Sequence, residues 1–155
     1  MISNPISKGI NGDANIPGDK SISHRSIIIP SISNGICEIN NILKSEDVLH
    51  TINAFKSMGV KIIEKDRKLL VYGNGLNSLK KSSKEIYLGN SGTSARLLIG
   101  LLSSQKFDSI LVGDESLSKR PMQRISDPLT KMNANIQTKN GYLPIKIKGA
   151  KLFPT

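Results

Sequence analysis

Residues 16–25, Ile-Pro-Gly-Asp-Lys-Ser-Ile-Ser-His-Arg, combine a chain break, a helix cap and two cations. The Pro-Gly pair interrupts any preceding element, and Asp19 occupies the position of a helix N-cap. Lys20 and Arg25 lie about 140° apart around a helix, so they can approach one ligand from two sides. Free backbone N–H groups, the positive end of the helix dipole and two cations favour an anion. The segment therefore predicts an anion-binding site at a helix N-terminus.

The same ten residues fit two other interpretations. One is an ordinary capped helix whose charges are solvated. The other is a nucleotide-binding loop of the form G-x-x-x-x-G-K-[ST]. That motif needs Gly immediately before the Lys, where Asp19 stands, and the spacing from Gly12 to Gly18 is one residue too long. The nucleotide-loop interpretation is therefore weak.

The charge of the chain favours anionic partners. Its 155 residues, about one domain, contain 22 Lys and Arg against 12 Asp and Glu, which gives a net charge of +10. Three Phe, three Tyr and no Trp make a base-stacking platform hard to build. Phosphates, acidic lipids and small polyanions therefore all fit the charge, and nucleic acid is not favoured.

Metal and membrane chemistry find little support in the sequence. Cys37 is the only cysteine, which excludes an internal disulfide and a Cys-based metal cluster. His24 and His50 are too few and too separated to indicate zinc. No leading apolar segment resembles a signal peptide, and no run reaches the roughly 18 apolar residues of a membrane span. We expect a soluble, cytoplasmic chain, and the sequence indicates no metal centre.

Hydrophobic spacing and chain breakers predict alternating helices and strands. Helices are expected over 20–33, 45–58, 94–103 and 121–132, and strands over 36–43, 60–63, 68–72, 86–88, 109–112, 134–138 and 143–148. Pro30 is expected to kink or shorten the first helix, and Pro121 to occupy the first position of the last. Residues 113–121 read as a polar loop, and Asn140-Gly141 predicts a β-hairpin.

Two parts of the chain repeat each other. Residues 20–25 align with 91–96 at an offset of 71, and residues 57–62 align with 131–136 at an offset of 74. The predicted fold class is therefore α/β, with βαβαββ units over about 16–75 and 86–149. Such repeats bury their faces against each other, and about three are needed for a closed core. Two units should leave apolar surface unpaired.

Three motifs resemble the enolpyruvyl transferase family. They are Pro-Gly-Asp-Lys-Ser-Ile-Ser-His-Arg at 17–25, Gly-Asn-Ser-Gly-Thr at 89–93 and Lys-Arg-Pro at 119–121. The resemblance implies two lobes of three βαβαββ units each, which close on the substrates. It implies that 1–15 form a lead-in segment or strand belonging with the other lobe. Residues 16–155 would then supply two of the three units of one lobe.

The resemblance also implies an activity. The family transfers the enolpyruvyl group of phosphoenolpyruvate to an acceptor hydroxyl and releases phosphate, without a metal or organic cofactor. Ser21, directly after Lys20, favours the branch whose acceptor is the 5-hydroxyl of shikimate 3-phosphate, in the shikimate pathway of aromatic amino acid biosynthesis. The implied substrate-binding residues are Lys20 for both substrates, Ser21 and Arg25 for shikimate 3-phosphate, Gly92 and Arg120 for phosphoenolpyruvate, and Asn90, Thr93, Asp47 and Arg96 in support.

The family's proton-transfer groups are not assignable among these residues. They are expected beyond Thr155, in the third unit and the second lobe, so this chain alone is not expected to turn over. Two alternatives stay open. One is an enolpyruvyl transferase that acts on a UDP-sugar, and the other is a non-catalytic basic module that binds anions or nucleic acid.

Overall fold

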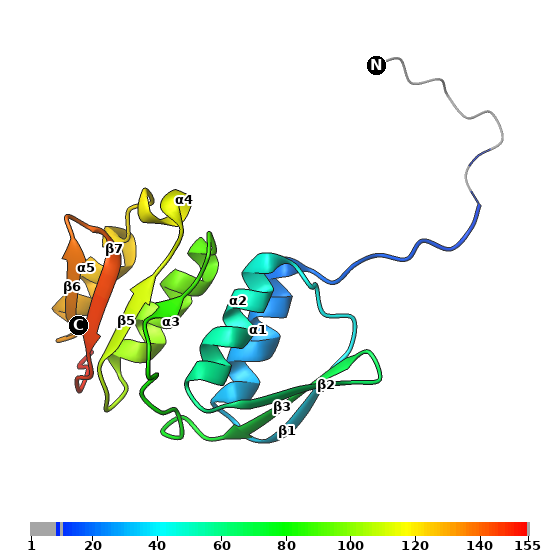
Figure 1. The fold of residues 1–155 in the computed structure, drawn as a ribbon, viewed down its shortest axis with the longest axis horizontal. Helices are drawn as coiled ribbons and strands as arrows, with labels where there is room; N and C mark the ends of the chain where they lie inside the picture. Colours follow the sequence, from blue (N-terminus) through cyan, green and yellow to red (C-terminus); the bar gives the residue numbers. More distant parts are fainter. Residues whose placement is uncertain (1–8, 10, 155) are drawn as a thin grey trace, which may run out of the picture.

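The computed structural model describes residues 9 and 11–154, in which two α/β units follow one another along the chain (Figure 1). The first unit consists of α1 (Lys20–Ser31), β1 (Asn34–Ile39), α2 (Glu46–Ser57), β2 (Lys61–Lys65) and β3 (Lys68–Asn74). The second unit consists of β4 (Ile86–Tyr87), α3 (Gly92–Ser103), β5 (Ser109–Val112), α4 (Glu115–Ser118), α5 (Gln123–Lys131), β6 (Asn135–Lys139) and β7 (Tyr142–Lys148). The predicted α/β class is confirmed.

Each unit has its own sheet. The first has the strand order β1-β3-β2 and is antiparallel throughout. The second has the order β4-β5-β7-β6, in which only β4 and β5 are parallel. The predicted hairpin turn is confirmed, since Asn140 and Gly141 have φ angles of 53° and 84°, the left-handed geometry that a two-residue hairpin requires.

The helix caps define the repeat. Asp19 Oδ1 accepts the Ile22 N–H at 2.7 Å, and Ser91 Oγ accepts the Ser94 N–H at 3.3 Å, three residues after the cap in both cases. Helix α3 therefore begins 92 − 20 = 72 residues after α1, one more than the sequence alignment predicted. Lys20 corresponds to Gly92 in the fold. The hairpins keep the predicted offset, since 135 − 61 and 142 − 68 both equal 74.

The start of the first unit differs from the expected pattern. Among the described residues no strand precedes α1, so that unit shows αβαββ where a leading strand was predicted. Residues 11–15 are exposed and run away from the body of the protein (Figure 1). The predicted lead-in segment 1–15 lies mostly outside the described residues.

Strand β1 ends at Ile39, and the predicted continuation to residue 43 is wrong. The following loop packs against the start of α1 instead. The Leu43 N–H donates to Ser23 Oγ at 3.0 Å, and a Cβ on Gly18 would lie 2.2 Å from the Asn41 carbonyl oxygen. This loop holds α1 at the end that carries Lys20.

The segment predicted as a polar loop at 113–121 contains a helical turn, α4. Asp114 Oδ1 caps it by accepting the Leu117 N–H at 2.7 Å, and the Leu117 side chain is fully buried. Pro121 does not begin the last helix, because the Met122 N–H donates to the Gly141 carbonyl at 2.8 Å and α5 begins only at Gln123. Helix α1 ends at Ser31 with Pro30 in its last turn, so the expected shortening of this helix is confirmed.

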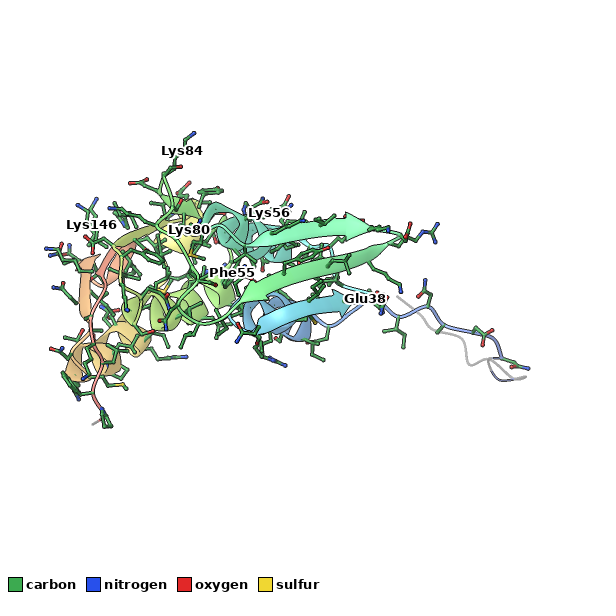
Figure 2. All side chains as sticks on the ribbon, turned by 90° about the horizontal axis from the view of Figure 1, so that it is seen from below. Glu38, Phe55, Lys56, Lys80, Lys84 and Lys146 are labelled. Atoms are coloured by element: carbon green, nitrogen blue, oxygen red, sulfur yellow. The ribbon has the colours of Figure 1, made fainter. Side chains whose placement is uncertain are left out.

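Helix α1 packs against strand β3, and helix α3 packs against strand β7. Helix α1 also contacts α2, and helix α3 contacts α5. Helix α3 contacts both α1 and α2 (Figure 1). Helix α2 turns Phe55 into the core, fully buried, and Lys56 outward (Figure 2). Ile22 and Ile29 of α1 remain 59% and 56% exposed, and Leu97 of α3 is 43% exposed, which agrees with the expected unpaired apolar surface. Within residues 9 and 11–154, no helix has the length and apolar character that a bilayer span needs.

Two glycines give opposite expectations for stability. A Cβ on Gly73 would lie 2.0 Å from the Pro30 carbonyl oxygen and 2.3 Å from that of Ser33, so backbone must move. Gly73→Ala is expected to lower the free energy of unfolding by about 1–3 kcal/mol. Gly100 lies inside α3, and apart from the backbone of its own helix no described atom lies within 4 Å of the added Cβ. Gly100→Ala should raise the free energy of unfolding by about 0.5–1 kcal/mol.

Urea unfolding of the two variants and the unsubstituted chain measures both effects. Equal stability of the two alanine variants would contradict this account of the packing.

Candidate functional site

The starts of α1 and α2 bring opposite charges together. Lys20 is the first residue of α1, and Asp47 lies in the first turn of α2. The Lys20 ammonium forms an ion pair with Asp47 Oδ2. The Lys20 side chain is 51% exposed and that of Asp47 is 13% exposed, so the cation keeps a solvent-facing side on which it can meet a ligand.

The start of α3 gathers two arginines. A Cβ on Gly92 would lie 2.9 Å from Arg96 Nη1 and 3.2 Å from Arg120 Nη1, so both guanidinium groups lie over the first turn. In the part of the chain that the structure describes, neither arginine forms an ion pair with a carboxylate. Two such cations beside free helix N–H groups constitute an anion-binding arrangement.

Helix α4 positions Arg120. Arg120 Nη2 donates to Ser116 Oγ at 3.2 Å, and the Arg120 N–H donates to the Leu117 carbonyl at 3.0 Å. The turn before α4 is joined to the turn before α3, because the Asp114 N–H donates to the Gly89 carbonyl at 2.9 Å. The fold therefore brings the segments 89–93 and 119–121 together.

A buried chain of polar side chains joins the two helix starts. His24 Nδ1 lies 2.8 Å from Thr51 Oγ1, which lies 2.6 Å from Ser94 Oγ, and this oxygen lies 2.7 Å from Ser91 Oγ. All four side chains have no solvent exposure. His24 Nε2 is also buried and has no hydrogen-bond partner among the described residues.

The environment of His24 favours its neutral form. Burial lowers the pKa of His24 below its ordinary value, the Asp47 carboxylate partly offsets this effect, and the Lys20 ammonium adds to it. A protonated ring would also place a second N–H at Nε2, where no described group accepts it. The ring is therefore neutral at pH 7.

The lowered pKa predicts a pH dependence of stability. In the unfolded chain the pKa of His24 is about 6.5, whereas in the folded chain this pKa is lower. Between the unfolded-state and the folded-state pKa, the unfolded state binds more protons than the folded state. The free energy of unfolding therefore falls as the pH drops below ~6.5, and it levels off below the folded-state pKa. Urea unfolding at a series of pH values measures how steeply the free energy of unfolding changes with pH, and His24→Asn should reduce this slope. Equal slopes for both proteins would contradict this assignment.

The predicted site residues fall into two groups. Lys20 and Asp47 lie together, and so do Gly92, Arg96 and Arg120. The remaining four are exposed near the same helix starts, without a hydrogen bond or ion pair to these groups in the described part of the chain: Ser21, Arg25, Asn90 and Thr93. Their roles remain predictions.

A cavity of about 460 Å³ lies elsewhere, across β4, β5 and β7, and none of the predicted residues lines it. Lys84 and Lys146, which do line it, project from one side of the molecule (Figure 2). Both groups of predicted residues therefore lie outside this cavity.

The sequence analysis missed the buried hydrogen-bonded side chains, although the spacing of two of them indicates their position. His24 follows Lys20 by four residues, and Thr51 follows Asp47 by four. Four residues correspond to about one helical turn, so each partner lies beneath a site residue on the same helix face.

The fold and these helix starts define a class, that of α/β repeat proteins whose helix N-termini carry cationic side chains. The chain belongs to the EPSP synthase (3-phosphoshikimate 1-carboxyvinyltransferase) family, whose model matches residues 5–154.

Two relatives named 3-phosphoshikimate 1-carboxyvinyltransferase illustrate the similarity. The protein of Ruthia magnifica subsp. Calyptogena magnifica is 56% identical over 142 residues, which cover 92% of this chain and 33% of the relative. That of Oenococcus oeni is 52% identical over 143 residues, which cover 92% and 33%. A solved EPSP synthase from Acinetobacter baumannii superimposes with a TM-score of 0.86 at 48% identity, covering 90% of this chain and 32% of that one. The chain thus spans about a third of the length of these relatives.

Proposed function

We propose that this chain forms the substrate-phosphate-binding part of an EPSP synthase. That enzyme transfers the enolpyruvyl group of phosphoenolpyruvate to the 5-hydroxyl of shikimate 3-phosphate, a step of the shikimate pathway. The observation that carries the proposal is the start of α3, where Arg96 and Arg120 lie over Gly92. Buried hydrogen bonds of Thr51 connect this helix start to the starts of α1 and α2, which carry the Lys20–Asp47 pair. Family membership supports the same conclusion.

Phosphoenolpyruvate is assigned to the start of α3. Its phosphate and carboxylate are anions that accept hydrogen bonds from Arg120, Arg96 and the free N–H groups of the first turn. Each charge-assisted hydrogen bond contributes about 1.5–3 kcal/mol. Gly92 allows a ligand close to the backbone, where a side chain would meet both guanidinium groups.

Shikimate 3-phosphate is assigned to the start of α1. Lys20, Ser21 and Arg25 supply one hydroxyl and two cations there, and all three are exposed. Lys20 has three donors, so it can contact both substrates while it remains paired with Asp47.

The proposed reaction forms one carbon–oxygen bond and breaks another. The 5-hydroxyl oxygen bonds to the enol carbon of phosphoenolpyruvate, the bond from that carbon to the phosphate oxygen breaks, and the hydroxyl proton is released with phosphate. The cations of this chain screen the repulsion between two polyanions and hold the hydroxyl near the enol carbon. We assign the proton-transfer groups to the rest of the enzyme.

We further propose that a third repeat unit and a second lobe complete the site. Relatives of about three times this length support this partner. The exposed apolar side chains of Ile22, Ile29 and Leu97 are available for such an interface.

Titration of the ¹⁵N-labelled chain tests the proposal. Phosphoenolpyruvate should shift the amide signals of the first turn of α3, and shikimate 3-phosphate those of α1, more than inorganic phosphate or UDP-N-acetylglucosamine does. Arg120→Gln should weaken the phosphoenolpyruvate effect, whereas Arg124→Gln, an exposed arginine in α5, should not. Equal responses to all ligands, or oligonucleotide binding that falls steeply with salt, would contradict the proposal.

A further inference from the structure

Thr51 is the centre of the buried polar chain. Its Oγ1 lies 2.8 Å from His24 Nδ1 on α1, 2.6 Å from Ser94 Oγ on α3, and 3.2 Å from the Asp47 carbonyl oxygen on its own helix. One hydroxyl thereby connects the three helices whose first turns carry the candidate site. These contacts span both repeat units, since His24 and Ser94 are 70 residues apart.

On each of the three helices, a candidate site residue lies close to the residue that takes part in these hydrogen bonds. His24 lies one turn after Lys20, Thr51 lies one turn after Asp47, and Ser94 lies two residues after Gly92. A helix is stiff over one turn, so fixing the rotation of each helix at its contact fixes the direction of the nearby site residue.

We propose that Thr51 is a positioning residue that holds the starts of α1, α2 and α3 in one register, so that the Lys20–Asp47 pair and the Gly92 turn face a common ligand. The identity of that ligand rests on the proposed function, but the positioning itself does not. Thr51 acts through the neighbouring side chains and does not touch the ligand.

The chemistry of the hydroxyl explains why threonine suits this place. A buried apolar residue of the same volume would fill the space without directional contacts, and packed helices could then rotate slightly. A buried polar network specifies one arrangement, because any shift leaves a desolvated donor or acceptor without a partner. Loss of the Thr51 hydroxyl would leave His24 Nδ1 without a described partner except Ser94 Oγ at 3.4 Å.

If Thr51 only filled space in the core, its substitution would not affect the helix starts selectively. Three variants distinguish this packing role from the proposed positioning role. Thr51→Val keeps the shape and removes the hydroxyl, whereas Thr51→Ser keeps the hydroxyl and removes a methyl group. Ser103→Ala is the matched control, because Ser103 is fully buried on α3 and, among the residues that the structure describes, its Oγ bonds only to the Ile99 carbonyl, at 2.7 Å.

Amide hydrogen exchange of the folded 155-residue chain is the test. The amides to follow are Ser23 and Ala95, whose N–H groups make the first i to i−4 bonds of α1 and α3, with Val71 in β3 as the core reference. Thr51→Val should speed exchange at Ser23 and Ala95 by about 10-fold relative to Val71, because the helix starts open locally. Thr51→Ser should restore the unsubstituted pattern, and Ser103→Ala should leave it unchanged.

A uniform change at all three amides, no change, or failure of serine to restore the pattern would overturn the proposal. If Thr51→Val does not fold, Ser94→Ala removes the same contact from the α3 side and must give the same selective effect. Titration of these proteins with phosphoenolpyruvate then separates the two hypotheses. An unsubstituted chain that binds no phosphorylated ligand contradicts the proposed function, while the exchange pattern still decides the role of Thr51.

Discussion

Gly92→Ala is expected to weaken phosphoenolpyruvate binding by about 10- to 100-fold, the equivalent of one charge-assisted hydrogen bond. The added methyl group would lie 2.9 Å from Arg96 Nη1 and 3.2 Å from Arg120 Nη1, so both cations must move away from the first turn of α3. Both atoms are the far ends of flexible side chains, so the fold can adjust. The free energy of unfolding should therefore change little, and the effect should appear in binding.

Calorimetry or NMR titration with phosphoenolpyruvate measures this loss, and urea unfolding measures stability alongside. Gly100→Ala is the matched control, because it is the same substitution in the same helix, and apart from that helix's own backbone no described atom lies within 4 Å of the new carbon. Unchanged affinity in Gly92→Ala would show that the ligand does not approach the start of α3.

Lys20→Ala should reduce the affinity for both shikimate 3-phosphate and phosphoenolpyruvate, each by about 10-fold or more, because one ammonium group serves both ligands. The substitution also leaves the Asp47 carboxylate without its cation, at a place where that side chain is only 13% exposed. An uncompensated negative charge beside the site would repel both polyanions further. The fold should remain, because the Lys20 side chain is about half exposed and contributes little packing.

Lys44→Ala is the control, since it breaks another lysine–carboxylate pair, with Glu64 at 2.5 Å, in which both side chains are more than half exposed. An exposed pair of this kind contributes about 0–1 kcal/mol, and its loss should leave both affinities unchanged. Loss of affinity for only one of the two substrates in Lys20→Ala would disprove the shared role of Lys20.

Much of the local structure could be predicted from the sequence. The Asp19 cap, the strand at 109–112, the Asn140-Gly141 turn and the hairpin offset of 74 were all predicted correctly. The reason is that caps and tight turns depend on residues within about four positions of each other. The motifs at 17–25, 89–93 and 119–121 likewise indicated the family before any contact was known.

The tertiary structure decided what depends on distant residues. Strand β1 stops at Ile39 because the following loop packs on the start of α1, and α5 starts at Gln123 because Met122 bonds to the second hairpin. The proximity of Arg96 and Arg120 over Gly92 required the turn before α4 to bond to the turn before α3. The Thr51 contacts join residues 27 and 43 positions apart. No local propensity encodes such separations, since they arise only when two repeats pack their helices together and bury the polar groups that must then pair.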